Sequence, residues 1–340
     1  MSRNYGLGSR DMTKAAAFAA NNATKEGVMG FKHAAGITGA FKQFSAFARD
    51  NGVRQLEFVT RDLVVRYGEH LADRVSNHEI GQGQAQNAVS AINTVMRLAT
   101  QGEWKSVSPT RECGIDQRSA IRETPPTGLD RAPLERGLTT LSERGQAIAE
   151  LAREFGLRAK EASLFNAQAA LREAQTRGVV SVTDGTKGGR PREVPINPQN
   201  LEHATRQLAV LERAADAQGM ARAVMPPDQN WKQWRESGLR EIRETLQQYG
   251  INRLHDLRSA YACERYQQLT GHAAPCLGGH SPRDIDRSAR LQIAHELGHG
   301  IHQYLAGQKQ TYFNSSTPLT LAETASVFGE MLTFKSLLSI

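Results

Sequence analysis

The chain has 340 residues, of which 23% are charged and 39% hydrophobic, an ordinary globular composition with length enough for two domains. It has no run of about 18 apolar residues, so we expect no membrane span. The N-terminus lacks the apolar stretch of a secretory signal, and Cys113, Cys263 and Cys276 have no metal-ligand spacing and cannot all pair. These features predict a cytoplasmic protein. The formal net charge of +7 favours polyanionic partners.

The positive charge is distributed unevenly along the chain. All 32 arginines lie in residues 1–300, whereas the last 40 residues hold two lysines and two glutamates. At the upstream density, a tail of that length would contain about four arginines. The composition therefore changes near residue 300.

The N-terminal part of the chain has a helical pattern. Its apolar residues recur at three- and four-residue spacing, which predicts about four amphipathic helices packed as one module over residues 1–110. By itself this pattern fits a plain helical bundle. Residues 111–135 are rich in proline and charge and are expected to be a linker. The clearest helical segments are 38–50, 60–75 and 84–100.

A second, mostly helical domain is expected over residues 136–300. Its first helical stretch, 134–177, is broken at Phe155-Gly156. Residues 178–197 then alternate with period two around a basic, glycine-rich loop, which predicts a β-hairpin. Later helices are expected at 199–248 and 254–270, then in a segment that carries His-Glu-Leu-Gly-His-Gly at 295–300.

Four basic residues stand out in this second domain. Arg158 follows the glycine break, Lys187 lies in the hairpin loop, and His255 and Arg258 share one helical face. Taken singly, each has a simpler explanation. Arg158 could cap a helix end, Lys187 could be a solvated charge in a turn, and His255 and Arg258 could be a surface pair. Together they suit a phosphoryl transition state, because guanidinium forks match phosphate oxygens and a lysine can protonate a leaving oxygen.

Four short motifs in order carry a family resemblance. Gly-Leu-Arg-x-x-Glu-Ala, Thr-Lys-Gly-Gly, His-x-x-Arg and Leu-Gly-His follow one another in the second domain. Residues 1–300 thereby resemble the tyrosine recombinase (phage integrase) family. The resemblance implies a mostly α fold, with a helical, SAM-like core-binding domain and an α-rich catalytic domain that contains a small β-hairpin or sheet.

The resemblance also implies a reaction. Arg158 and Arg258 would hold the scissile phosphate, and Lys187 would protonate the departing 5′ oxygen. His255 and His299 would hydrogen-bond the phosphate while a tyrosine attacks it, leaving a 3′ phosphotyrosine. The ester keeps the bond energy, so no metal or nucleotide cofactor is implied. The implied partner is duplex DNA, with the protein oligomeric on it.

The expected nucleophile is out of place. The family sets its tyrosine about nine residues after the third-box histidine, where this chain has Gln308. Tyr304 and Tyr312 lie five and thirteen residues after His299. Tyr304 comes four residues before the expected position, a shift of more than one helical turn. It is therefore a candidate nucleophile only if the local helix is rebuilt.

From residue 295 onward the chain resembles a different family, the M3 oligopeptidases of the oligoendopeptidase F type. The similar text runs from His-Glu-Leu-Gly-His-Gly through Leu-Ala-Glu-Thr-Ala to Gly-Glu-Met-Leu. The resemblance implies zinc bound by His295, His299 and Glu323, with Glu296 as general base and Glu330 in support. The chain ends before the family's downstream substrate-binding residues.

The chain therefore reads as a hybrid, with a recombinase body and a peptidase-like tail over residues 301–340. A gene fusion, a recombination product and an assembly artefact would each give such a sequence. The first functional hypothesis is a DNA integrase associated with a mobile element, whose activity is reduced or lost through the displaced tyrosine. The alternatives are a zinc metallopeptidase fragment and a DNA-binding protein without catalysis.

Overall fold

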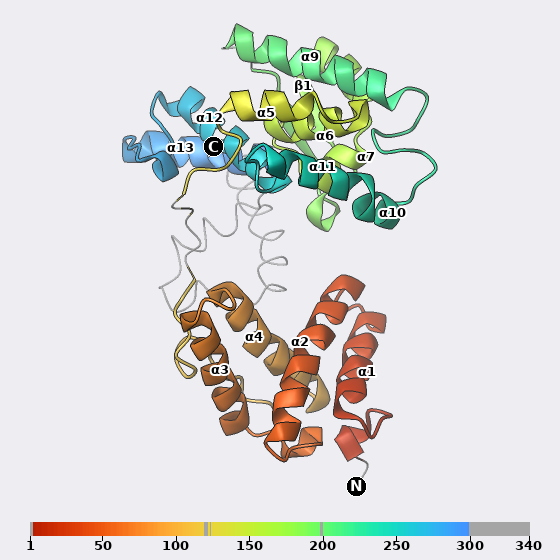
Figure 1. Ribbon diagram of the computed structural model, residues 1–340, viewed down its shortest axis with the longest axis vertical. Coiled ribbons are helices and arrows are strands. Elements are labelled where there is room, and N and C mark those ends of the chain that lie inside the picture. Colours follow the sequence, from red (N-terminus) through yellow and green to blue (C-terminus); the bar gives the residue numbers. More distant parts are fainter. Residues whose placement is uncertain (1–2, 119–121, 123, 198–199, 299–340) are drawn as a thin grey trace, which may run out of the picture. The chain divides into compact units, whose positions relative to one another are not determined.

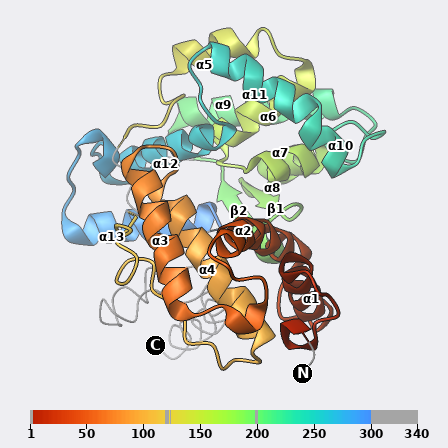
Figure 2. The same cartoon turned by 60° about the horizontal axis from the view of Figure 1, so that its bottom comes forward.

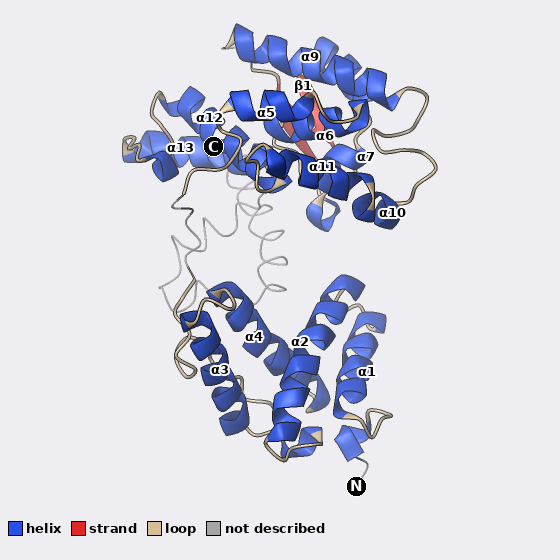
Figure 3. Ribbon diagram, in the orientation of Figure 1, coloured by secondary structure: helices blue, strands red, loops and turns tan. Residues whose placement is uncertain are grey.

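The computed structural model describes residues 3–118, 122, 124–197 and 200–298. The chain divides into two compact units, residues 1–121 and 122–340, and each has its own hydrophobic core. The described residues are mostly helical with one two-stranded sheet, so the predicted fold class is confirmed (Figure 3). Within them, no helix is long and apolar enough to span a membrane.

The first unit is built from four α-helices (Figure 1). The Thr60 hydroxyl accepts a hydrogen bond from the Leu63 amide at 3.2 Å and so caps one helix, at the boundary that the sequence indicated. The core is aromatic, and Phe44 packs edge-on against both Phe41 and Tyr67. The helices are α1 (Met12–Lys25), α2 (Phe31–Asp50), α3 (Arg61–Ser76) and α4 (Gln82–Ala99), with 3-10 turns η1 (Arg3–Gly6) and η2 (Leu56–Phe58).

The start of the expected linker belongs to this core. Val107, Cys113 and Ile115 are buried in the first unit. A Cβ atom on Gly68 would lie 2.3 Å from the Cys113 sulfur, so a residue without a side chain is required where the chain crosses α3. The segment after α4 therefore covers the bundle through residue 115, beyond the predicted linker start at 111.

The second unit holds the remaining elements, and its hairpin follows α8 and precedes α9 in the chain. Figure 2 shows the two strands beside α8. Its two strands pair antiparallel, with Val180 opposite Val194 and Val182 opposite Arg192, which confirms the predicted hairpin. The elements are α5 (Arg131–Leu138), α6 (Glu143–Glu154), α7 (Ala159–Leu164), α8 (Ala167–Arg177), β1 (Val179–Val182), η3 (Lys187–Gly189), β2 (Arg192–Pro195), α9 (Leu201–Gln218), α10 (Trp231–Glu236), α11 (Gly238–Gln248), α12 (Leu254–Thr270), η4 (Pro275–Leu277) and α13 (Arg283–Glu296).

The predicted break at Phe155-Gly156 separates α6 from α7. Gly156 has φ +61°, and a Cβ there would lie 2.6 Å from Leu297 and 2.7 Å from the Tyr261 ring. Only glycine fits this bend without strain or displacement of its neighbours. The bend therefore brings the start of α7, the middle of α12 and the end of α13 together.

The last described helix ends earlier than the sequence predicted. A continuous helix was expected through His-Glu-Leu-Gly-His, but α13 ends at Glu296, with Leu297 as its C-cap residue. Gly298 is left-handed at φ +61°, and its amide donates to the His295 carbonyl at 2.9 Å. A glycine in this conformation is a common helix terminator. The expectation of one unbroken helix is therefore wrong, because the chain turns out of the helix before residue 299.

Candidate active site

The start of α7 presents the first predicted site residue. Arg158 is the N-cap residue of α7, and its backbone amide donates to the Glu161 carboxylate at 2.7 Å. The Arg158 guanidinium also binds that carboxylate, at 2.6 Å, while the side chain stays 23% exposed. Glu161 thus holds Arg158 by both backbone and side chain, and part of the guanidinium remains accessible.

Glu161 is the centre of a buried ion cluster. It has no exposed surface, and Arg192 on β2 donates to its two oxygens at 2.9 and 2.6 Å. Burial alone would raise the pKa of Glu161, but hydrogen bonds from Arg192 and Arg158 outweigh burial and lower it to about 2. Glu161 is therefore ionised at neutral pH and fixes two arginines that come from different elements.

Arg258 on α12 lies behind this cluster. It is 2% exposed, and its guanidinium donates to the Leu297 carbonyl at 2.5 Å and to the Gly156 carbonyl. A Glu161 oxygen lies 3.8 Å away. Burial, together with the charges of Arg158 and Arg192, lowers the pKa of Arg258 to about 9, so the guanidinium keeps its charge at neutral pH. Arg258 thus ties the bend before α7 to the end of α13.

His255 lies one turn before Arg258 and is exposed. Loss of water around the ring and then the charge of Arg258 lower its pKa, with a further contribution from Arg158 and an opposing one from Asp256. The Asp256 carboxylate accepts hydrogen bonds from Thr127 at 2.6 Å and from Arg122 at 3.1 Å. The lowered pKa favours the neutral ring, and the bonds of Asp256 fix the first turn of α12 that carries it.

The remaining predicted residues are placed differently. Lys187 begins η3 in the hairpin loop and is exposed. Of the four basic residues, the structure brings three together, because Arg158 and Arg258 lie 2.6 and 3.8 Å from Glu161 and the charges of both act on His255. His299, Tyr304, Gln308, Tyr312, Glu323 and Glu330 lie outside the described residues.

The described part of the metal motif has a structural role. His295 is exposed, whereas Glu296 is 2% exposed, so the two side chains face different surroundings. The Glu296 carboxylate accepts hydrogen bonds from Tyr261 at 2.8 Å and from Arg265 at 3.0 to 3.2 Å. Among the described residues, no three His, Cys, Asp or Glu side chains could share a metal ion. A glutamate bound in this way does not fit the general base of a zinc centre.

Sequence reasoning missed the residues that hold the site together. Glu161 stood inside the Gly-Leu-Arg-x-x-Glu-Ala motif, three residues after Arg158, and that spacing could have identified it as a partner. Arg192 opens the second hairpin strand, and its Nε donates to the Glu296 carbonyl at 2.8 Å. No local pattern predicts that contact, because it joins residues 104 positions apart.

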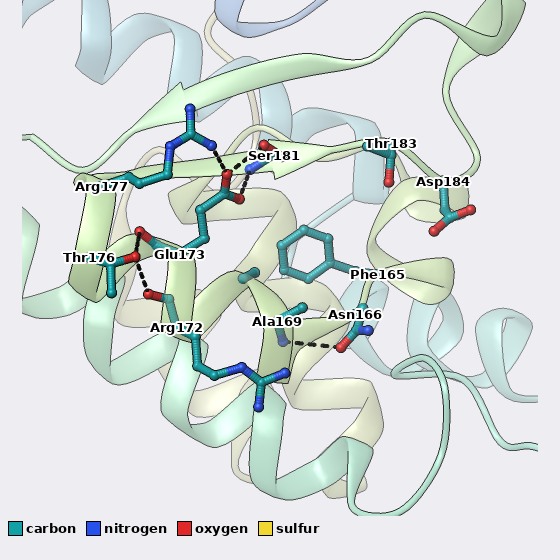
Figure 4. A pocket seen from close by; sticks show the side chains of 11 residues that line it. Phe165, Asn166, Ala169, Arg172, Glu173, Thr176, Arg177, Ser181, Thr183 and Asp184 are labelled. Atoms are coloured by element: carbon teal, nitrogen blue, oxygen red, sulfur yellow. Dashed lines mark hydrogen bonds and ion pairs between the residues drawn. The ribbon is translucent and has the colours of Figure 1, made fainter.

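Another hollow of the described structure lies between α8 and β1, with a volume of about 480 Å³. Its polar side chains bind one another (Figure 4). The Glu173 carboxylate accepts from the amide and hydroxyl of Ser181, each at 2.7 Å, and it pairs with Arg177. None of the predicted catalytic residues that the structure describes lines this hollow. The arginine cluster, rather than this hollow, is the candidate site.

Comparison with known proteins matches both halves of the sequence interpretation. The model of the family described as Integrase matches residues 130–264, and that of Peptidase family M3 matches residues 286–339. The two resemblances are therefore confirmed, with the integrase match covering α5 to most of α12. None of the curated proteins matches the chain.

Solved structures show the same fold. A lambda integrase tetramer bound to a Holliday junction matches with a TM-score of 0.54 and 14% identity over 84% of this chain and 76% of that chain. A lambda integrase dimer bound to a COC′ core site matches with a TM-score of 0.52 and 14% identity over 87% of this chain and 75% of that chain. The described body of the chain thus has the tyrosine recombinase fold.

Proposed function

We propose that this protein binds duplex DNA and acts as a site-specific recombinase that cleaves and rejoins strands through a phosphotyrosine. The observation that carries the proposal is the cluster of Arg158, Arg258 and His255, fixed by the buried carboxylate of Glu161. Preorganised guanidiniums stabilise the charge that develops on a phosphate in the transition state. The recombinase fold and the Integrase match support the same conclusion.

Each residue would have a separate task. The partly exposed Arg158 would bind the scissile phosphate directly, with the charge of Arg258 behind it. The neutral ring of His255 could donate one hydrogen bond and accept a proton. Lys187, on the exposed hairpin loop, would reach the leaving 5′ oxygen when DNA is bound. His299 would contact the phosphate from the segment that follows Gly298.

The proposed nucleophile is Tyr304. A suicide DNA substrate that loses a short fragment after cleavage traps the protein–DNA ester. We expect a covalent adduct with the wild-type chain and none with Tyr304→Phe, while Tyr312→Phe serves as the matched control. An adduct that survives Tyr304→Phe would sink Tyr304 as nucleophile. DNA binding with no adduct from any variant would identify a DNA-binding protein whose catalytic step is lost.

The most direct test of the arginine cluster is the substitution Arg158→Lys. Lysine keeps the charge but cannot bind a carboxylate and a phosphate through one planar fork. We expect adduct formation to fall at least about 100-fold, within the range lost when one transition-state donor is removed. DNA affinity should change little. Equal losses of affinity and cleavage would mean that Arg158 is only a binding contact.

The match of residues 286–339 to Peptidase family M3 motivates a second candidate, a zinc peptidase. His295, His299 and Glu323 would be the ligands. Metal analysis of the purified full chain would find about one zinc that His295→Ala removes, together with cleavage of short peptides. The buried bonds of Glu296 weigh against this candidate, and metal-free protein would dispose of it.

A further inference from the structure

A small hollow in the first unit is surrounded by arginines. It lies where the N-terminal segment, the start of α1 and the C-terminal half of α2 meet, and its volume is about 160 Å³. Pockets for drug-sized ligands begin at roughly 300 Å³, so this one suits a group the size of a small oxyanion. Its charged lining consists of Arg3, Arg10, Arg49, Arg54 and one acidic residue, Asp11.

The guanidiniums of this hollow have no carboxylate partner within the described residues. Asp11 is already engaged, because its carboxylate accepts the Lys14 amide at 2.8 Å as the cap of α1. The Arg49 guanidinium donates to a backbone group, the Ser45 carbonyl, at 3.2 Å. The hollow thus gathers four positive charges around one carboxylate that caps a helix.

Some other arginines of the same unit have carboxylate partners. Arg61 lies 2.5 Å from Glu112, and Arg74 lies 2.9 Å from Glu79. Among the described residues, what distinguishes the hollow is that four arginines share one small volume with a single carboxylate. Like charges that share a small volume repel one another unless a counter-charge joins them.

The backbone that carries these arginines is fixed. Asn4 is fully buried, and its side chain accepts the Leu56 amide at 2.8 Å and donates to the Ser9 carbonyl at 2.9 Å. The Tyr5 amide donates to Glu57 at 2.6 Å. These bonds hold the segment with Arg3 and Arg10 against the loop with Arg54, so the charges converge on an ordered site.

We propose that this hollow binds a phosphate group, either a backbone phosphate of duplex DNA or a free phosphate. Guanidinium forks donate paired hydrogen bonds to phosphate oxygens, and four arginines line this hollow. The site is distinct from the cluster around Glu161, since all its residues belong to the first unit. Binding of a DNA phosphate rests on the proposed function, whereas binding of free phosphate does not.

The test compares two double variants of the full chain. Arg10→Gln with Arg54→Gln removes two charges from the hollow, and within the described structure neither side chain has a hydrogen bond or ion pair to lose. Arg97→Gln with Lys105→Gln is the control, since both residues are exposed in the same unit and lie outside the hollow. Fluorescence of Trp104 checks that the unit stays folded.

Two ligands are titrated, a 30-base-pair duplex and inorganic pyrophosphate. If the source is DNA, the hollow variant should weaken duplex binding and reduce the slope of log K against log salt by about 0.9 for each DNA phosphate that it no longer neutralises. If the ligand is a free phosphate, the hollow variant should lose pyrophosphate binding, while its affinity for the duplex equals that of the control variant. Binding of both ligands equal to that of the control variant would overturn the proposal. Failure of the wild-type chain to bind DNA would contradict the proposed function, and the pyrophosphate titration would still decide the hollow.

Discussion

Two sets of arginines, one in each unit, serve opposite purposes. In the second unit, Arg192 and Arg258 are buried, and carboxylate or carbonyl oxygens accept their hydrogen bonds. In the first unit, Arg10 and Arg54 are exposed beside a hollow and have no carboxylate partner in the described structure. A buried charge without a partner costs several kcal/mol, whereas an exposed charge keeps its water. Burial therefore decides whether an arginine holds the fold or stays available for a ligand.

The largest effect is expected from Glu161→Gln. The change leaves Arg192 buried without a counter-charge and takes the carboxylate from Arg158. Breaking a buried pair by removing one partner costs about 3–5 kcal/mol. Urea unfolding followed by the fluorescence of Trp231 and Trp234 would measure the loss in the second unit. Glu244→Gln is the control, because Glu244 pairs with Arg240 where both are exposed, and an equal loss there would contradict the comparison.

Acid should weaken the second unit. Arginine hydrogen bonds lower the pKa of Glu161 to about 2, and His203 and Arg131 do the same for Glu154, in each case against the effect of burial. Because the folded pKa lies below the ordinary value of 4.5, these pairs stabilise fully above about pH 4.5. That stabilisation is lost as the pH falls from there through the folded pKa of about 2. Unfolding free energies measured across this acid range should drop, and less steeply in Glu161→Gln.

The sequence predicted most of the helices, the hairpin and the break before Arg158, since each depends on local periodicity or on glycine. It did not predict that residues 219–230 interrupt the helical stretch expected over 199–248. It also predicted three basic residues that the structure brings together. The contacts among them could not be predicted, because Arg192 meets Glu161 across 31 positions and Arg258 meets Leu297 across 39. Such contacts follow from how the elements pack.

The end of α13 shows how a local motif can mislead. His-Glu-Leu-Gly-His suggested a helix with two histidines on one face, yet Gly298 ends the helical path. Two buried guanidiniums, of Arg192 and Arg258, donate to the Glu296 and Leu297 carbonyls and so cap the helix end. The helix ends where distant residues satisfy its last carbonyls, and the motif contains no sign of them.

A smaller effect is expected from Tyr261→Phe. Burial and the charge of Glu296 raise the pKa of Tyr261, so its hydroxyl stays protonated and donates to that carboxylate. Glu296 keeps Arg265 and Gln292 after the change. One hydrogen bond to a charged group is worth about 1.5–3 kcal/mol. We expect urea unfolding of the second unit to show a loss of unfolding free energy near the lower end of that range. A loss as large as that of Glu161→Gln would show that Glu296 depends on Tyr261 more than on Arg265.

The smallest effect, and the one with the opposite sign, is expected from Arg54→Gln. Because Arg54 is exposed and unpaired in the described structure, the substitution removes repulsion from Arg3, Arg10 and Arg49 and breaks no bond. The first unit, followed by Trp104 fluorescence at low salt, should be unchanged or more stable by up to about 0.5 kcal/mol. Added salt should erase the gain, since it screens exposed charges. A clear destabilisation would mean that Arg54 holds the fold as Arg192 does, and the distinction between the two sets of arginines would then fail.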